Sequence, residues 1–245
     1  MSTRTGAAGP DSATAAPSGG RGEPRAPSRR EQILREAARL FAERGFHGVG
    51  VDEIGAAVGI SGPGLYRHFP GKDAMLAELL VGISERLHEG GRTRLAEADA
   101  AGSPAGDALD ALIAGHIDFA LDDRPLITLH DRELDRLRDE DRKRVRRLQR
   151  EYVELWVGVV REVHPGLPER EARAAVHAVF GLLNSTPRLS RPAALPDRSR
   201  TAALLHRLAR GAFAAAADRA PDGHAAGGHA ADGQPTEGHA AGEPG

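Results

Sequence analysis

The stretch that decides the fold is "VDEIGAAVGISGPGLYRHFPGK", residues 51–72. Its first half predicts a short helix, because the apolar side chains of Ile54 and Val58 recur at helical spacing. Gly59 then ends that helix, since glycine readily adopts the left-handed conformation found just past helix ends. A tight turn is therefore expected around residue 59.

A second helix is expected directly after this turn. Ser61 is a favourable N-cap, and Pro63 is tolerated in a first turn, where its missing N–H has no intrahelical partner. Leu65 and Phe69 lie four residues apart and predict the buried face of this helix. Two short helices joined by "GIS" form a helix-turn-helix, a motif whose second helix enters the major groove of DNA.

The residues around this buried face suit contact with DNA. The hydroxyl, guanidinium and imidazole of Tyr66, Arg67 and His68 can donate to phosphates or to base edges. Lys72 follows at the start of the next helix, where its charge and the free N–H groups favour a phosphate. The surrounding glycines lower helix propensity but let the helix N-terminus come very close to a ligand.

The segment "REQILREAARLFAERGFHGVGVDEIGAAVGISGPGLYRHFPGKDAMLAELL", residues 30–80, contains this motif and extends beyond it on both sides. It resembles the TetR family of bacterial transcriptional regulators. The resemblance implies a homodimer with an N-terminal DNA-binding head and a C-terminal body that binds a ligand and dimerises. By position it implies base contacts from Gly62, Pro63, Gly64 and Arg67, and phosphate contacts from Tyr66, His68 and Lys72.

One departure from the family pattern precedes the first helix of the motif. Val49, Gly50 and Val51 stand where the family usually has a capping Thr or Ser, so Gly50 is expected to cap this helix. With glycine at two recognition positions, specificity is expected to come from Arg67, from backbone contacts and from DNA shape.

Composition limits the possible chemistry. The chain has 245 residues and a net charge of −2, so any basic surface for DNA must be local. The absence of cysteine excludes disulfides, thiol catalysis and cysteine-ligated metals, and it fits a reducing cytoplasm. No apolar run approaches the ~20 residues of a membrane span, and no secretory signal is recognisable.

Apolar residues recur at helical spacing along the central part of the chain, without a strand pattern, so we expect an all-α fold of about nine helices. The expected divisions are a disordered tail at 1–27, a helix-turn-helix domain at 28–90, a ligand-binding and dimerisation domain at 91–217, and a second disordered tail at 218–245. The second tail repeats "GHAA" three times. A solvated low-complexity tail is favoured there over weak metal binding.

The body offers polar and aromatic candidates for a pocket among Leu, Ile and Val, and such a lining suits a mostly apolar ligand. The candidates are His116, His130, Arg132, Tyr152 and Trp156. A satisfied core histidine is the alternative for His116. The basic run "DRKRVRRLQR", residues 141–150, is interpreted as a charged helix surface with local ion pairs rather than a second nucleic-acid site.

The last two predicted helices, 168–184 and 196–217, are the expected dimer interface. Both are rich in alanine with Val, Leu and Phe, and two such helices from each subunit would form a four-helix bundle. Val179 and Leu205 are expected to lie in that contact.

The leading functional hypothesis is a repressor that leaves its operator when a small molecule binds, with an acyl-CoA or lipid-like effector. A ligand-dependent activator or a co-repressed regulator is the alternative. A helical adaptor or an enzyme is less favoured, because HExxH, GxSxG, P-loop and strand-linked GxGxxG motifs are absent. We therefore expect no catalytic residues, no metal and no cofactor.

Overall fold

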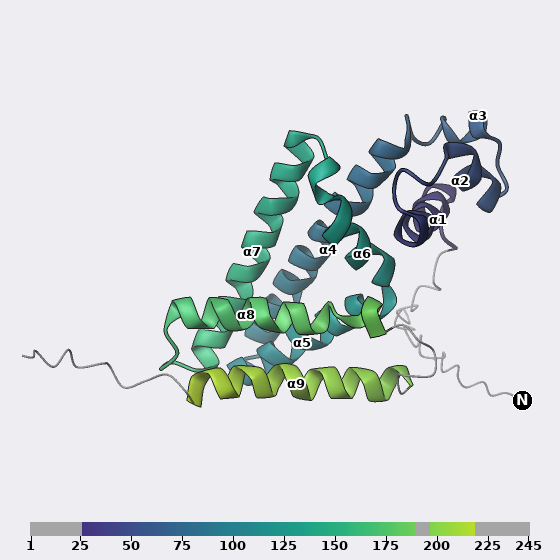
Figure 1. The fold of residues 1–245 in the computed structure, drawn as a ribbon. Coiled ribbons are helices and arrows are strands. Elements are labelled where there is room, and N and C mark those ends of the chain that lie inside the picture. Colours follow the sequence, from purple (N-terminus) through teal and green to yellow (C-terminus); the bar gives the residue numbers. More distant parts are fainter. Residues whose placement is uncertain (1–25, 190–196, 219–245) are drawn as a thin grey trace, which may run out of the picture.

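The computed structural model describes residues 26–189 and 197–218, and every regular element there is helical (Figure 1). The elements are α1 Arg29–Arg44, α2 Val51–Ala57, α3 Gly62–Leu65, α4 Lys72–Ala100, α5 Ala105–Asp122, α6 Arg124–Glu133, a 3-10 turn η1 Leu134–Arg136, α7 Asp139–Val163, α8 Glu169–Leu183, a 3-10 turn η2 Thr186–Leu189 and α9 Arg198–Asp218. The predicted all-α fold is confirmed for this part of the chain. Nearly all of both expected tails, including the "GHAA" repeats, lies outside the described residues.

The first two helices are bounded by residues that are favourable at helix ends. The Ser28 hydroxyl accepts from the N–H of Glu31, and the Glu31 carboxylate accepts from the N–H of Ser28, which makes a reciprocal cap for α1. α1 ends at Gly45, whose φ is 78°. Gly50 precedes α2 and donates its N–H to the Glu53 carboxylate at 3.0 Å. These caps fix the loop that joins α1 to α2.

The head, α1 to α3 with the start of α4, has its own apolar core. Phe41, Leu65 and Phe69 are almost completely buried in it, and burial of side chains of this size is worth roughly 1.5–3 kcal/mol each. Leu126 and Leu129 of α6 belong to the same core. The head is therefore packed onto α6 as well as joined to the body by α4.

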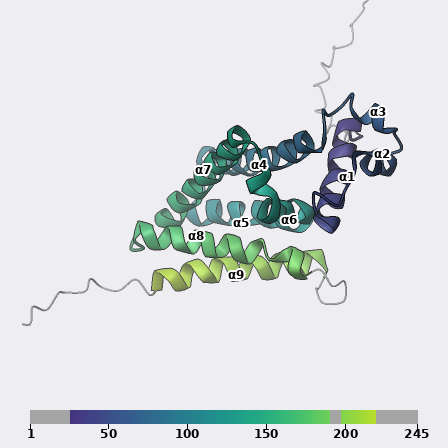
Figure 2. The ribbon, with the colours of Figure 1, turned by 45° about the horizontal axis from the view of Figure 1, so that its top comes forward.

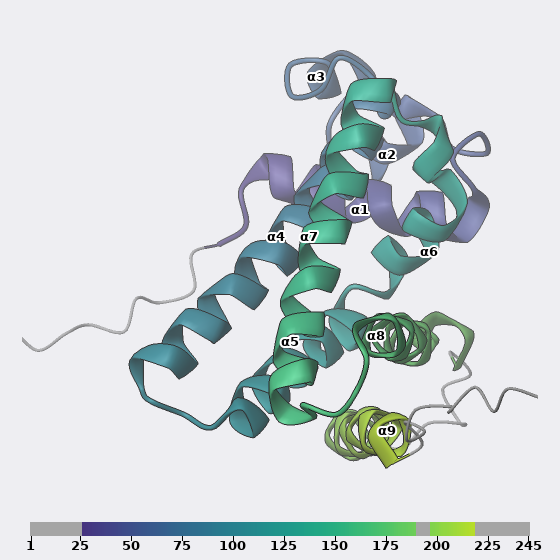
Figure 3. The ribbon, with the colours of Figure 1, turned by 90° about the vertical axis from the view of Figure 1, so that its left-hand side faces the viewer.

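Helix α4 continues from the head into the body without a break, so the domain boundary expected at residue 90 falls inside a helix. Figure 2 shows α8 and α9 lying side by side, on the side of the body away from α2 and α3. In Figure 3, α8 and α9 are seen almost along their axes, while α4 and α7 run alongside each other. In the part of the chain that the structure describes, no helix is both long and apolar enough to cross a membrane.

The body core is centred on Trp156, which is fully buried. Val179 of α8 is 1% exposed and Leu205 of α9 is 5% exposed, and both belong to this core. Our expectation that these two side chains lie in a dimer contact is therefore corrected. The helical spacing identified a buried face, but that face packs within the same chain.

Candidate DNA interface and ligand cavity

The recognition segment is a single helical turn followed by an irregular turn. Ser61 Oγ accepts from the N–H of Gly64 at 3.3 Å and caps α3, and Gly59 takes a φ of 70° just before it. Residues 66–68 form a turn instead of continuing the helix to Phe69. Pro70 disfavours helical backbone at Phe69, the residue before it, and so opposes continuation of the helix beyond this turn.

Three of the predicted DNA-contacting residues, Pro63, Tyr66 and Arg67, are exposed in this segment. Tyr66 is 56% exposed, a large fraction for an aromatic side chain in a small helical head. The other predicted residues of the segment, Gly62, Gly64 and His68, are half-buried. The structure thus brings the predicted residues together on one end of the head.

Lys72 lies against the loop between α1 and α2. Its Nζ donates to the carbonyls of Phe46 at 3.0 Å and Val49 at 3.2 Å, and it lies 4.6 Å from the centre of the Phe46 ring. An ammonium group has three N–H donors, so one remains for a phosphate. Lys72 therefore fixes this loop in addition to carrying charge.

Two arginines at the start of α1 stabilise the head. Arg30 pairs with Glu78, donates to the carbonyl of His68 and lies over the Phe69 ring at 4.1 Å. Arg29 donates to the carbonyl of Val58 at 2.9 Å.

Sequence reasoning missed the role of Gly55. A Cβ atom on Gly55 would lie 2.8 Å from the carbonyl oxygen of Ile60, so only glycine lets α2 approach the turn this closely. The signal was available, because a glycine inside an otherwise helical pattern often marks a close backbone approach.

The body encloses a cavity of about 300 Å³ between α4, α5, α6, α7 and α8. Three of the five predicted ligand residues line it: His116, His130 and Tyr152. Sequence reasoning missed His177, Phe180 and Asn184, which α8 and the residue after it contribute from far along the chain. The remaining wall is mostly apolar, from Ile83, Leu87, Phe119, Leu126, Ile127, Leu148 and Val153, with Ser84, Asp131 and Gln149 as further polar residues.

His116 is the central polar group of this cavity. Its Nε2 lies 3.1 Å from Asn184 Oδ1, and its Nδ1 lies 3.3 Å from the Tyr152 hydroxyl. Because an amide oxygen only accepts, Nε2–H donates to Asn184 and Nδ1 accepts from Tyr152. The His116 ring also stacks on Phe180, with centroids 4.7 Å apart.

Burial holds these groups in their neutral forms. It lowers the pKa of His116 to about 4, opposed by the hydrogen bond to Asn184. It also raises the pKa of Tyr152 to about 12. At neutral pH the cavity wall therefore offers uncharged hydrogen-bonding groups beside aromatic faces.

The other two predicted ligand residues lie outside this lining. Trp156 is fully buried behind it and meets the His116 ring edge-on at 5.9 Å between centroids. Arg132 is exposed and donates to the carbonyl of Ala42 in α1 at 3.5 Å, because its position on α6 faces the head.

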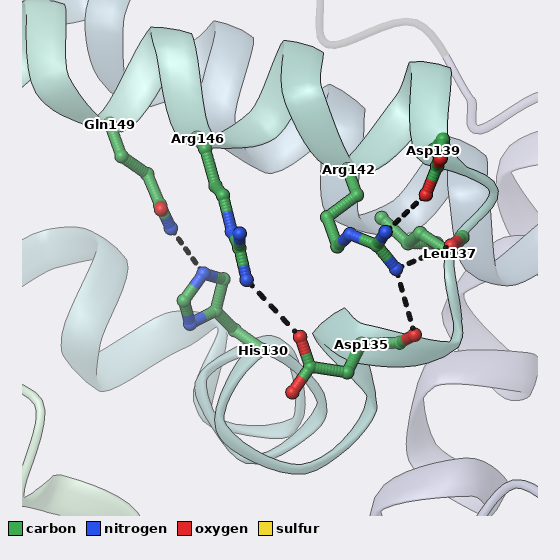
Figure 4. Close-up of polar contacts among 7 residues, drawn as sticks. All are labelled: His130, Asp135, Leu137, Asp139, Arg142, Arg146 and Gln149. Atoms are coloured by element: carbon green, nitrogen blue, oxygen red, sulfur yellow. Dashed lines mark hydrogen bonds and ion pairs between the residues drawn. The ribbon is translucent and has the colours of Figure 1, made fainter.

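The basic run of α7 forms local ion pairs, as its sequence indicated (Figure 4). Arg142 pairs with Asp139, and Arg146 lies 3.3 Å from Asp135. Gln149, one turn further along, contacts His130 at the cavity wall. Val145 and Leu148 form the buried face.

Two family models match the chain over most of its described part. A model of "Bacterial regulatory proteins, tetR family" matches residues 33–79, and a model of "Tetracyclin repressor-like, C-terminal domain" matches residues 102–189. The transcriptional repressor KstR2 of Rhodococcus jostii is 33% identical over 133 residues, which are 54% of this chain and 63% of that relative. The matched region thus spans less than two thirds of this curated relative.

Solved structures agree with the family over most of the chain. The TetR family regulator PfmR of Thermus thermophilus is 28% identical, with a TM-score of 0.60, over 72% of this chain and 96% of that one. The regulator AibR, solved with isovaleryl coenzyme A and operator DNA, shares the fold with a TM-score of 0.61 at 20% identity, over 74% and 97% of the two chains. The chain belongs to the TetR family of bacterial regulatory proteins, which are DNA-binding transcriptional regulators.

Proposed function

We propose that this protein is a transcriptional repressor that binds operator DNA as a homodimer and is released by a small, largely apolar effector. The observation that carries the proposal is the position of α6, which packs against the head on one side and lines the body cavity on the other. The expected division into a DNA-binding domain, residues 28–90, and a ligand-binding and dimerisation domain, residues 91–217, is part of this proposal.

DNA binding is assigned to the segment around α3. Arg67, with Gly62, Pro63 and Gly64, faces the bases, and Tyr66, His68 and Lys72 hold phosphates. The exposure of Tyr66 and Arg67 at the end of the head supports this assignment. Neither side chain forms a hydrogen bond or ion pair with residues 26–189 or 197–218, so both are available for another molecule.

Helix α6 connects the effector to the DNA-binding head. Ile127 and His130 line the cavity. At the end of the same helix, the buried Glu133 carboxylate accepts from the N–H of Phe46 at 3.5 Å and pairs with Arg136, which contacts His47. A ligand that shifts α6 would therefore move the loop before α2, and a ligand favouring the DNA-free arrangement would lower DNA affinity.

The cavity supports an effector with an apolar body and a polar end. Its wall is largely apolar, and His116, His130 and Asn184 supply hydrogen-bonding groups. An acyl-CoA would place its acyl chain here, because a space of about 300 Å³ is too small for the whole coenzyme. The isovaleryl coenzyme A bound to AibR supports this effector class.

The homodimer is assigned to α8 and α9. Leu204 and Leu208, on α9, are 41% and 46% exposed, which leaves an apolar stripe on the outer side of this helix pair. A symmetric four-helix bundle would bury the stripe, and its two-fold axis would match a near-palindromic operator.

An operator-release assay tests the proposal. Duplexes selected from a random pool by the full chain are labelled, and their release is followed by fluorescence anisotropy with acyl-CoAs of graded length. Gln149→Trp, which narrows the cavity, should reduce release, and Arg150→Trp, on an exposed neighbour outside the lining, should not. If no acyl-CoA releases the duplex from either the wild-type protein or Arg150→Trp, the proposed effector class is contradicted, but DNA binding is not.

A reporter gene behind the selected operator determines the sign of the response. Repression requires that expression falls when the protein is present and recovers when the effector is added. If expression instead rises when the effector is added, while the protein stays bound to the operator, the protein is a ligand-dependent activator.

A further inference from the structure

A second, polar cavity of about 240 Å³ lies between α4, α5 and α7. It shares Ile83, Leu87, Phe119 and Tyr152 with the cavity around His116, and these side chains form the wall between the two. Its remaining lining is different in kind, because it contains the guanidinium groups of Arg86 and Arg94.

Arg94 is partly buried in this cavity, and its guanidinium group has few polar partners there. Its Nη1 donates to the carbonyl of Gly90 at 2.9 Å, and this is its only hydrogen bond within the described residues. No carboxylate in that part of the chain lies within ion-pair distance of it. A guanidinium group has five N–H donors, and withdrawing it from water without a partner is unfavourable.

Two glycines make room for this arrangement. A Cβ atom on Gly115 would lie 2.5 Å from Arg94 Cζ, so the guanidinium rests directly on the backbone of α5. A Cβ atom on Gly91 would lie 2.9 Å from the Tyr152 ring. Glycine inside a helix is less stable than alanine, so α4 and α5 each lose some helix stability where they make room for Tyr152 and Arg94.

The carboxylates of the cavity are committed elsewhere or lie toward its other end. Asp118 and Asp122 pair with Arg198 of α9 at 3.0 and 2.6 Å. Asp123 is half-buried, and burial raises its pKa, with the charge of Arg86 acting in the opposite direction. Asp118, one helical turn from Gly115, is paired with Arg198, and Asp122 and Asp123 follow Gly115 by two helical turns, about 10 Å. Among the described residues, Arg94 therefore has no carboxylate as an ion-pair partner.

We propose that Arg94 binds the carboxylate of a small, mostly apolar carboxylic acid in this cavity. A guanidinium holds a carboxylate through two parallel hydrogen bonds. Leu87, Leu112 and Phe119 supply apolar walls for the rest of the acid, and the small volume excludes a coenzyme A group. The site is separate from the effector cavity and does not rest on the proposed regulation.

Calorimetric titration of the full chain tests the site. The probes are acetate, butyrate, hexanoate, benzoate and phenylacetate, with the matching amide of each acid as its uncharged control. At least one acid should bind, and its amide should bind at least tenfold more weakly. Arg94→Gln should weaken binding of that acid by tenfold or more, and Arg94→Lys by less.

Two further variants separate the site from general effects of charge and folding. Arg92→Gln removes an exposed arginine two residues away and should leave acid binding unchanged. Gly115→Ala displaces the guanidinium without changing charge and should weaken binding in protein whose circular dichroism remains that of wild type. Binding of no acid up to millimolar concentration, equal binding of acid and amide, or undiminished binding by Arg94→Gln would each overturn the proposal.

Discussion

At the scale of single residues, the proposed DNA contacts divide into those that read sequence and those that do not. The Tyr66 hydroxyl makes no hydrogen bond within the described residues, so Tyr66→Phe should leave the thermal stability unchanged. It should weaken binding to operator and to scrambled DNA by the same factor, roughly three- to tenfold, because a phosphate contact carries no sequence information. Gel-shift titrations on both duplexes measure this. A loss confined to the operator would contradict the phosphate assignment.

Arg67→Ala should behave differently. A lost base contact costs about 1–3 kcal/mol at one position of each half-site, so the preferred base there should change while binding to scrambled DNA changes little. Competition between operators with each base at that position measures the effect. Unchanged base preferences would remove Arg67 from base readout.

Lys72 does not allow such a clean test. Lys72→Ala removes two hydrogen bonds to the loop before α2, so it should lower the melting temperature as well as DNA affinity.

His116 predicts a specific dependence of stability on pH. Its folded-state pKa of about 4 lies below the ordinary 6.5, so protonation favours the unfolded chain. The stability that depends on neutral His116 is fully present above pH 6.5 and is lost as pH falls toward 4, by about 3 kcal/mol in all. Urea unfolding at pH 7.5 and pH 4.5 should show a smaller loss for His116→Gln than for wild type. An equal loss in both proteins would show that His116 is not held neutral.

At the scale of elements, α9 has two faces with different roles. Leu205 is 5% exposed and packs in the chain's own core, so Leu205→Glu should unfold the protein. Leu208, 46% exposed, lies on the outer face, so Leu208→Glu should give folded monomers with poor operator binding. Light scattering with circular dichroism separates the two outcomes. An intact dimer for Leu208→Glu would move the interface away from this face.

Helix α6 is the second element with a testable role. Glu133→Gln keeps the shape of the side chain but weakens its links to Phe46 and Arg136. If these links carry the effector's influence, the ratio of DNA affinities without and with a saturating acyl-CoA should fall several-fold in the variant. The affinity of the body for that acyl-CoA in the absence of DNA should change little. An unchanged ratio would place the coupling elsewhere.

At the scale of the whole molecule, the sequence predicted features that depend on neighbouring residues better than features that depend on the packing of distant segments. Ser61 and Gly59 predicted the cap and the turn, and Leu65 and Phe69 predicted the inward face, because these features depend on neighbouring residues. The shortness of α3 was missed although Pro70 was visible. Pro70 disfavours helical backbone at Phe69, and the spacing of Leu65 and Phe69 still gave two buried side chains.

Features that join distant segments were not accessible from the pattern. Asn184 reaches His116 across 68 residues, and the contact of Arg94 with Gly115 depends on the register between α4 and α5. Helical spacing predicted that Val179 is buried, but a single chain's pattern does not distinguish its own core from a partner's surface. Arg132 was grouped with the pocket for its charge, although its position on α6 turns it toward α1.

The most direct test of the central claim is selection of DNA from a random pool by the full-length protein, followed by titration of the enriched duplex at several salt concentrations. A near-palindromic site bound by two subunits is expected. Its affinity should fall steeply with salt, by roughly 0.9 log units for each phosphate contact per log unit of salt, and Arg67→Ala should lose the site's sequence preference. No enriched sequence, or an affinity that does not depend on salt, would contradict it.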